Sequence, residues 1–277
     1  MPAARYAVFG HPIAHSLSPR LHGLFAAQAG IELKYVAIDV APATFARSVR
    51  AFFATGGRGA NVTLPHKGAA FELADERTPA ACRLGVANVL TRWPDGRLEA
   101  DSNDGAGMLA DLRARRGFDP AGRDVLLLGA GGAARAAAVA LLDDASVRTL
   151  TIANRTLERA QALAKALADP ARVRVTAWQT LGDIGARALI VNATSAGVHD
   201  EGLALPATLV SARSHAYDLS YGAAARSFVA WAQQAGCLAA SDGLGMLVET
   251  VAASFTRWHG ARPDVEAALD ALQMAHR

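Results

Sequence analysis

Short apolar runs alternate along the chain with longer stretches in which apolar residues recur at helical spacing. The short runs predict buried strands, and the longer stretches predict helices. In the first hundred residues, strands are predicted at Tyr6–Gly10, Lys34–Val40 and Ala60–Leu64. Helices are predicted from an N-cap at Ser18 to a stop at Gly30, at Ala43–Ala54 and from about Lys67. Asp95 and Gly96 predict a hairpin turn between strands at 85–92 and 97–100.

The second part of the chain, from about Asp104, repeats a strand followed by a helix. After a helix at Gly105–Arg116, the segment DVLLLGAGGAARAAAVALL predicts a strand, a glycine turn and a helix. Further strands are predicted in RTLTIANRT, VRVTAW, ALIVNATSAG, SHAYDLSY and CLAAS. Further helices are predicted in LERAQALAKALA, at Ala223–Gln234 and in the tail from Gly243, where Pro263 starts the last one. Such units predict a parallel sheet covered on both faces, and therefore an α/β fold.

The composition excludes several classes of protein. With 277 residues, 52% of them apolar and 19% charged, the chain is long enough for two domains, or one large one, and too apolar to be disordered. A net charge of +3 is too small to indicate nucleic-acid binding. Cys82 and Cys237 lack the spacing of a metal site or a disulfide framework, which favours a cytoplasmic protein without a bound metal. The most apolar stretch, Val125–Leu142, contains Arg135, so no membrane span is expected.

The motif GAGGAA follows an apolar strand and opens an alanine-rich helix, as in dinucleotide-binding folds. Gly129 allows a sharp turn, and Gly131 leaves room for a pyrophosphate beside the backbone. The N–H groups and the positive dipole end of the helix would then face the phosphates. A tight turn without a ligand is the alternative. The turn and the start of the helix comprise Gly129, Ala130, Gly131, Gly132 and Ala133.

The end of the next strand indicates which dinucleotide is bound. An NAD site places an acidic residue there for the ribose 2′-hydroxyl. This strand ends instead in Asn154, Arg155 and Thr156, with Arg159 one helical turn later and no carboxylate before Glu158. Because guanidinium groups bind phosphate by paired hydrogen bonds, these residues predict NADP. Two solvated surface arginines are the alternative.

Polar residues gather at strand ends in the first part of the chain, and their hydroxyls and amides suit a small polyhydroxylated molecule. Lys67, one of only three lysines among 28 Lys and Arg residues, and Asp104 supply an amine and a carboxylate where two domains could meet. If they converge in a cleft, they can pass a proton to or from a substrate oxygen while a hydride moves at carbon. The alternative for each is a helix cap or a surface charge.

The motifs resemble those of the shikimate dehydrogenases, in order and over essentially the whole chain: SLSP, NVTLPHK, Asn88, DSNDG, GAGGAAR, NRT, NATSAG, YDLSY and DGLGML. The resemblance implies an N-terminal α/β substrate-binding and catalytic domain, residues 1–104 with 242–277. It implies an NADP-binding Rossmann domain at residues 105–241 and an active site in the cleft between the two. The implied activity is the reversible NADPH-dependent reduction of 3-dehydroshikimate to shikimate, in the biosynthesis of chorismate and the aromatic amino acids.

The resemblance also implies roles for single residues. Lys67 resembles the catalytic lysine and Asp104 its partner, while Ser16 and Ser18 resemble the pair at the substrate carboxylate. The full set of implied substrate contacts besides Lys67 and Asp104 is Ser16, Ser18, Asn61, Thr63, Asn88, Tyr221 and Thr250. The implied NADP contacts besides the glycine motif are Asn154, Arg155, Thr156, Arg159, Thr194, Gly243 and Met246. The implied partner is the small-molecule substrate, and the expected state is a monomer or homodimer.

Two motifs depart from the family pattern, at three positions in all, and both concern the substrate. The family usually has Asn-Thr-Asp-Gly where this chain has Ser102, Asn103, Asp104 and Gly105, and it usually has a glutamine that bonds substrate hydroxyls where this chain has Thr250. One alternative is therefore a paralogue in the same fold that acts on quinate or a related cyclic polyol acid. The other is a non-catalytic regulator that binds NADP or shikimate, which would not need a proton-transfer pair.

Overall fold

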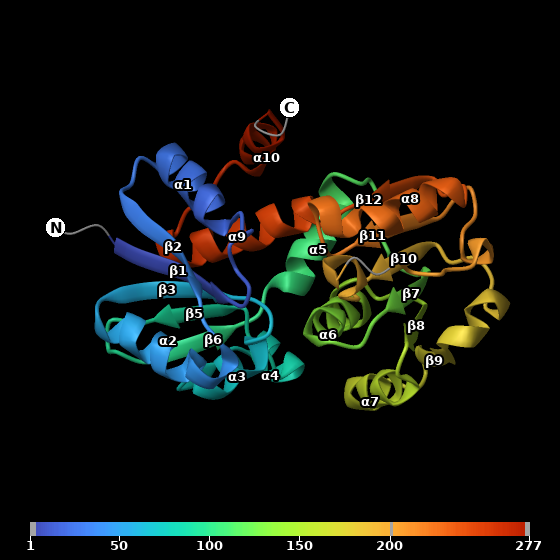
Figure 1. Ribbon diagram of the computed structural model, residues 1–277, viewed down its shortest axis with the longest axis horizontal. Coiled ribbons are helices and arrows are strands. Elements are labelled where there is room, and N and C mark those ends of the chain that lie inside the picture. Colours follow the sequence, from blue (N-terminus) through green and yellow to red (C-terminus); the bar gives the residue numbers. More distant parts are fainter. Residues whose placement is uncertain (1–3, 200–201, 275–277) are drawn as a thin grey trace. The chain divides into compact units, whose positions relative to one another are not determined.

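A computed structural model describes residues 4–199 and 202–274. Backbone contacts divide the chain into two compact units, Met1–Asn103 with Val248–Arg277, and Asp104–Leu247. Each unit contains a six-stranded sheet covered by helices on both faces (Figure 1). The predicted α/β fold with two domains is confirmed. The domain boundaries expected after residues 104 and 241 stay a prediction.

The first unit is built on a mixed sheet in the order β2-β1-β3-β5-β6-β4. Its strands are β1 (Ala4–Gly10), β2 (Leu33–Asp39), β3 (Gly57–Val62), β4 (Glu76–Arg77), β5 (Val89–Arg92) and β6 (Leu98–Asp101). Its helices are α1 (Ser18–Ala29), α2 (Phe45–Ala54), α3 (Lys67–Leu73), α4 (Pro79–Leu84), most of α9 (Leu244–His259) and α10 (Val265–Met274). Strands β5 and β6 form the predicted antiparallel hairpin, and Gly96 in its turn has a φ of 91°.

Two features of the first unit differ from the sequence prediction. Residues 76–84 form β4 and α4, where the pattern predicts no element. The signal there is local, because Thr78 caps α4 by accepting the Ala81 N–H at 3.2 Å and Pro79 occupies the first helical position. Ser18 is not an N-cap, since α1 begins at Ser18 itself and the N-cap, Leu17, makes no side-chain capping bond.

Side chains alternate between the two faces of this sheet. One face is apolar and packs against α2 and α3, with a core of Ala7, Phe9, Ala60, Val62, Phe45, Val49, Phe52 and Phe53. The other face carries Tyr6 and Asn61 toward α1 and α9 (Figure 1). A Cβ on Gly59 would lie 2.4 Å from the Trp258 ring, so glycine is needed where this part of α9 approaches the sheet.

The second unit is built on a wholly parallel sheet in the order β12-β11-β10-β7-β8-β9. Its strands are β7 (Asp124–Leu128), β8 (Thr149–Asn154), β9 (Val173–Ala177), β10 (Leu189–Asn192), β11 (His215–Asp218) and β12 (Ala239–Ser241). Its helices are α5 (Asp104–Ala114), α6 (Gly132–Val139), α7 (Leu157–Leu167) and α8 (Arg226–Gln234). Apolar cores cover both faces, which explains why β7 and β10 are continuously apolar.

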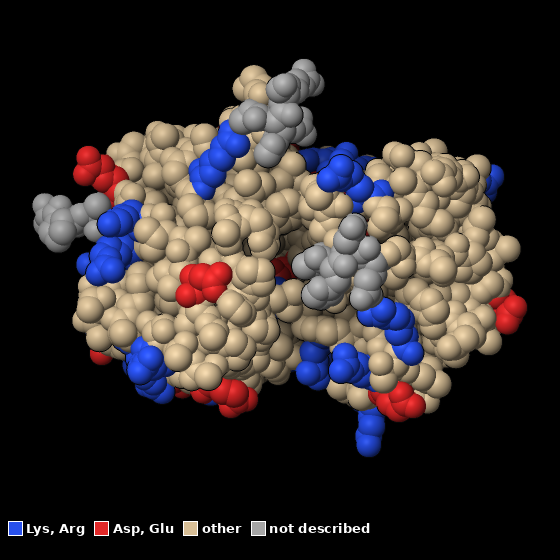
Figure 2. All heavy atoms as spheres, in the orientation of Figure 1, with Lys and Arg blue, Asp and Glu red and all other residues tan. Residues whose placement is uncertain are grey.

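The described residues contain no helix that is long and apolar enough to cross a membrane. They also contain no group of three or more His, Cys, Asp and Glu residues that could hold a metal ion. Cys82 and Cys237 are free thiols. On the face of the molecule shown in Figure 2, basic and acidic side chains lie in small separate groups among uncharged residues.

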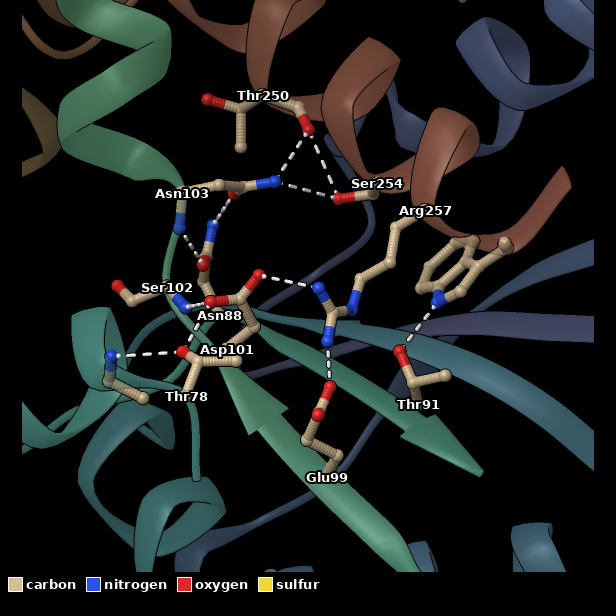
Figure 3. A network of polar contacts seen from close by, with 12 residues as sticks. Thr78, Asn88, Thr91, Glu99, Asp101, Ser102, Asn103, Thr250, Ser254 and Arg257 are labelled. Atoms are coloured by element: carbon tan, nitrogen blue, oxygen red, sulfur yellow. Dashed lines mark hydrogen bonds and ion pairs between the residues drawn. The ribbon is translucent and has the colours of Figure 1, made fainter. Parts of the chain in front are cut away.

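Polar bonds and aromatic packing both attach α9 to the first sheet. Arg257 forms ion pairs with Glu99 and Asp101 of β6 (Figure 3). Trp258 donates from Nε1 to the Thr91 hydroxyl at 3.0 Å. These contacts satisfy polar groups of the sheet that face the helix, so α9 is held at a defined position along the strands.

We expect Arg257→Met to lower the free energy of unfolding by about 2–4 kcal/mol, because it leaves two partly buried carboxylates side by side without their cation. Arg97→Met is the matched control, since Arg97 also pairs with two carboxylates but its side chain is 56% exposed, against 26% for Arg257. The control should cost less than about 1 kcal/mol. Urea unfolding of both variants measures the loss of unfolding free energy. Equal losses in the two variants would contradict the claim that burial makes the Arg257 ion pairs more important than those of Arg97.

Candidate functional site

The carboxyl ends of the parallel strands form a candidate cofactor site in the second unit. Strands β8 and β9 follow β7 on one side of the sheet, and β10, β11 and β12 follow on the other side of β7. Open α/β sheets bind ligands at the point where the strand order changes direction in this way. Gly129 lies directly after β7 with a φ of 109°, and a Cβ on it would lie 2.8 Å from the Ala193 carbonyl oxygen after β10. Only glycine therefore allows these two turns to approach each other.

The glycine turn leaves open space at the start of α6. Gly131 is the N-cap of this helix, and a Cβ on Gly131 or Gly132 would meet no atom within 4 Å. Ala130 packs against the apolar core, and Ala133 is half-buried in the first turn. The N–H groups of that turn have no helical partners, so they suit an anionic group placed in the open space.

The end of β8 and the first turn of α7 present two arginines, and the strand end itself carries no carboxylate. Asn154 donates from Nδ2 to the Thr156 carbonyl oxygen at 2.9 Å, which fixes the shape of the loop. Arg155, Thr156 and Arg159 are exposed at the start of α7, and the Arg159 N–H donates to the same carbonyl oxygen at 3.1 Å. Glu158 is also exposed and, like Arg159, lies in the first turn of the helix rather than at the strand end. These residues fit a phosphate on the ribose.

A buried carboxylate fixes the turn that follows β10. The Asn192 side chain accepts hydrogen bonds from the Thr194 N–H at 3.1 Å and the Thr194 hydroxyl at 2.8 Å. Its Nδ2 donates to Asp218 at 2.7 Å, and Asp218 also accepts the Ser220 N–H at 2.7 Å. Burial raises the pKa of Asp218 to about 6. Asp218 therefore acts through Asn192 to hold Thr194 at the same edge as Gly129.

Three further predicted residues also belong to the second unit. Tyr221 is half-buried and precedes a short 3₁₀ turn. A Cβ on Gly243 would lie 2.5 Å from the Leu219 carbonyl oxygen, so this position again requires glycine. Met246, in the first turn of α9, packs against the apolar core of the unit.

In the first unit, Ser18 and Asn61 converge on Tyr35. The Tyr35 hydroxyl donates to Asn61 Oδ1 at 2.8 Å. Burial raises the pKa of Tyr35, and the bonds to Asn61 and Ser18 oppose that rise. The Ser18 N–H donates to the Ser16 hydroxyl at 3.3 Å, so the two predicted carboxylate ligands are neighbours at the start of α1.

The Asn61 amide is fully engaged by residues of its own unit. His22 is fully buried, with its ring stacked on Tyr35 at 4.0 Å and its Nε2 3.3 Å from Asn61 Oδ1. Burial lowers the pKa of His22 to about 3, so the ring is neutral and donates from Nε2. Asn61 Nδ2 donates to the Ser254 hydroxyl at 2.9 Å and to the Asn88 carbonyl oxygen at 3.4 Å.

Lys67 and Asn88 are held close together by the backbone. Lys67 is the first residue of α3, and its carbonyl oxygen accepts the Ala87 N–H at 2.9 Å. The next residue, Asn88, accepts the Val62 N–H on its carbonyl oxygen at 2.9 Å. Thr63 follows Val62 and is half-buried. The structure thus gathers three predicted substrate residues, Thr63, Lys67 and Asn88, where β3 ends and β5 begins.

Thr250 lies on α9 beside this group. Its backbone carbonyl oxygen accepts hydrogen bonds from Asn103 Nδ2 at 3.1 Å and from the Ser254 hydroxyl at 3.0 Å. Its own hydroxyl points away from both (Figure 3) and is buried with no hydrogen-bond partner within the described structure. Such a hydroxyl suits a polar group of a ligand. Asp104 is buried at the start of α5 and belongs to the second unit.

Six residues outside the predicted set bond to predicted site residues, Asp218 through Asn192: His22, Tyr35, Asn103, Asn192, Asp218 and Ser254. A signal for two of them is present in the sequence. His22 follows Ser18 by four residues, and Ser254 follows Thr250 by four, so each repeats a polar position on one helix face. The signal for Asn192 and Asp218 is weaker, because both follow apolar strands where turn residues are common.

Comparison with known proteins agrees with this geometry. The family model described as the shikimate dehydrogenase substrate binding domain matches residues 8–90, and the one described as shikimate / quinate 5-dehydrogenase matches residues 112–199. A protein named shikimate dehydrogenase (NADP(+)) from Xanthomonas campestris pv. campestris is 52% identical over 275 residues, which cover 99% of this chain and 96% of that protein.

Solved structures are similar over nearly the full length. The Ael1 enzyme from Pseudomonas putida is 40% identical with a TM-score of 0.88, and the match covers 98% of both chains. Shikimate 5-dehydrogenase from Thermus thermophilus, in complex with NADP(H) and shikimate, is 32% identical with a TM-score of 0.84 over 98% of this chain and 99% of that one. With the motifs, both matched domains and this full-length similarity, the chain belongs to the shikimate dehydrogenase family.

Proposed function

We propose that this protein is an NADP-dependent shikimate dehydrogenase that reversibly reduces 3-dehydroshikimate to shikimate. The observation that carries the proposal is the similarity, over 98% of the chain, to a structure that holds NADP(H) and shikimate. The polar groups of the first unit and the glycine turn of the second supply sites of matching chemistry. The proposal places the enzyme in the cytoplasm, as a monomer or homodimer with a small-molecule substrate.

The residues of the second unit fit NADP. The space beside Gly131 and the first turn of α6 would take the pyrophosphate, and Arg155 and Arg159 would bind the 2′-phosphate. Thr194, held by Asn192, would contact the cofactor from the opposite strand, and Gly243 and Met246 would complete the contacts. When bound, the nicotinamide ring accepts a hydride from a substrate carbon or returns it.

The residues of the first unit divide into direct ligands and supports. We assign the substrate carboxylate to Ser16 and Ser18. Tyr221, a residue of the second unit, is assigned to the substrate as well. We assign the ring hydroxyls to Thr63, Asn88 and Thr250. Asn61 is expected from the resemblance to be a ligand as well, but its amide is already bonded to Tyr35, His22 and Ser254. We therefore propose that Asn61 positions neighbouring groups instead of binding substrate.

Lys67 is the proposed proton donor in the reduction, with Asp104 orienting the same substrate oxygen. As hydride reaches the carbonyl carbon, the C=O electron pair moves to oxygen, and the Lys67 ammonium supplies the proton that completes the hydroxyl. In the oxidation each transfer reverses. The start of α3 and the Ala87 hydrogen bond fix the Lys67 backbone, so only its side chain must adjust.

A second candidate is a paralogue that prefers quinate or a related cyclic polyol acid. It is favoured by the partnerless Thr250 hydroxyl and by Asn103, both of which depart from the family pattern at the substrate. A steady-state panel of shikimate, quinate and related cyclohexenols with NADP and NAD tests both candidates. The highest kcat/KM for shikimate supports the first, and the highest for quinate supports the second.

We expect Arg155→Ala and Arg159→Ala each to lower the preference for NADP over NAD by about ten- to a hundredfold, because each removes a charged hydrogen bond to phosphate. The measurement is the ratio of the kcat/KM values for the two cofactors. Arg148→Ala, an exposed arginine at the opposite end of the sheet, should leave that ratio unchanged. Equal kcat/KM for NADP and NAD in the unmodified enzyme would refute the assignment.

Lys67→Ala should lower kcat by about 10²–10⁴-fold with a modest change in the KM for shikimate, because it removes the proton-transferring group. Lys67→Arg should not restore kcat, since a guanidinium does not release its proton in the working range of pH. Lys34→Ala, an exposed lysine on β2, is the control and should keep the kcat of the unmodified enzyme. Near-normal kcat in either Lys67 variant would make Lys67 a binding or structural residue.

Thr250→Gln should change the KM or the substrate preference and leave the KM for NADP nearly unchanged, because residue 250 lies in the substrate-binding unit. The measurement is kcat/KM for shikimate and quinate at saturating NADP. An effect confined to the KM for NADP would show that Thr250 does not face the substrate.

A further inference from the structure

We propose that Asn103 is a positioning residue for substrate recognition, which fixes the amide of Asn88 and connects it to Thr250 on α9. The inference rests on the proposed function, in which Asn88 and Thr250 bind substrate hydroxyls. Asn103 follows the last strand of the first sheet and lies between the two (Figure 3). The motif resemblance marks Asn103 as a departure from the family pattern near the substrate but gives it no contact or positioning role.

Asn88 and Asn103 form a reciprocal pair of hydrogen bonds. The Asn103 backbone N–H donates to Asn88 Oδ1 at 2.9 Å, and Asn88 Nδ2 donates to Asn103 Oδ1 at 2.7 Å. A flipped Asn88 would place its NH₂ group against the Asn103 N–H and its oxygen against the Asn103 oxygen. Since both contacts would then be repulsive, Asn103 determines which end of the Asn88 amide is oxygen and which is nitrogen. Asn88 is 3% exposed, so solvent does not compensate for a flip.

Asn103 also connects Asn88 to α9. Asn103 Nδ2 donates to the Thr250 carbonyl oxygen at 3.1 Å and to the Ser254 hydroxyl at 3.2 Å. Both amide hydrogens of Asn103 are thereby used within the unit, so its amide has no further hydrogen to donate to a ligand. Ser254 in turn accepts from Asn61 at 2.9 Å. The network joins the end of β6, Asn88 and one turn of α9 into a single hydrogen-bonded group.

Threonine, the usual residue here in the family pattern, cannot make the same set of bonds. Its hydroxyl has one hydrogen to donate, whereas Asn103 donates two and accepts one. A threonine at 103 would keep its backbone bond to Asn88 but lose at least one of the two bonds to α9. The turn that carries Thr250 would then be less firmly held, and Thr250, shorter than glutamine, would adjust poorly to a substrate hydroxyl.

The test is Asn103→Thr, measured as KM and kcat for shikimate, KM for NADP and the midpoint of thermal unfolding. We expect the KM for shikimate to rise about tenfold, the kcat to change less than about threefold and the KM for NADP to stay within about twofold. Thr91→Val is the matched control. It removes a different buried hydrogen bond between α9 and the same sheet, the one from Trp258, and should leave the KM for shikimate unchanged.

The inference is overturned if the KM of Asn103→Thr for shikimate stays within twofold of that of the unmodified enzyme. It is also overturned if Thr91→Val raises this KM equally, because any loosening of α9 would then have the same effect. If Asn103→Thr does not fold, Ser254→Ala removes one of the two bonds to α9 and should raise the same KM about threefold; an unchanged KM overturns the inference. A crystal structure with shikimate should show the Asn103 amide bonded to Asn88 and not to the ligand. An unmodified enzyme without activity on shikimate would instead refute the proposed function.

Discussion

A row of buried polar bonds attaches α9 to the first sheet, and the first unit depends on it because its chain is interrupted. The chain leaves this unit after Asn103 and returns at Val248, so α9 has no short connection to the strands that it covers. Asn103 bonds to the Thr250 turn, Asn61 to Ser254 and Arg257 to β6. Directional bonds fix the position of the helix along the strands, which apolar packing alone specifies less sharply.

The same bonds determine which polar groups remain available to a ligand. Asn61, Asn103 and Ser254 satisfy one another, while the Thr250 hydroxyl is left without a partner in the described structure. A fully bonded network holds its members rigid. Rigid supports allow the few groups that face a ligand to discriminate between substrates. The proposed role of Asn103 follows from this arrangement, since it acts on Asn88 and Thr250 through hydrogen bonds.

In the second unit, the ends of the parallel strands hold the polar groups of the candidate cofactor site in place. Its sheet is wholly parallel, so the strand ends of β7, β8 and β10 bring Gly129, Asn154 and Thr194 to one edge. Asp218, from the neighbouring strand β11, acts through Asn192 on the Thr194 turn. Backbone geometry supplies the cofactor edge, and a buried carboxylate–amide pair holds one side of it in place.

The sequence by itself determined most of the elements and the chemistry of the motifs. Helical spacing in α2, continuous apolar runs in β7 and β10 and the Asp95–Gly96 turn are local properties, and the structure confirms each of them. The local signal at Ser18 was misleading, because Pro19 follows it as in a capped helix although the helix already begins at Ser18. The glycine motif and the arginines after β8 predict NADP binding from local sequence alone.

Only the tertiary structure shows which polar residues are already bonded within the protein. Asn61 lies within β3 and Asn88 directly precedes β5. Asn61 is enclosed by Tyr35, His22 and Ser254, whereas the amide of Asn88 is fixed by Asn103. These partners lie between 15 and 193 residues away along the chain. Hydrogen bonds over such separations depend on the pairing of strands and the placement of α9, which no local pattern of residues encodes.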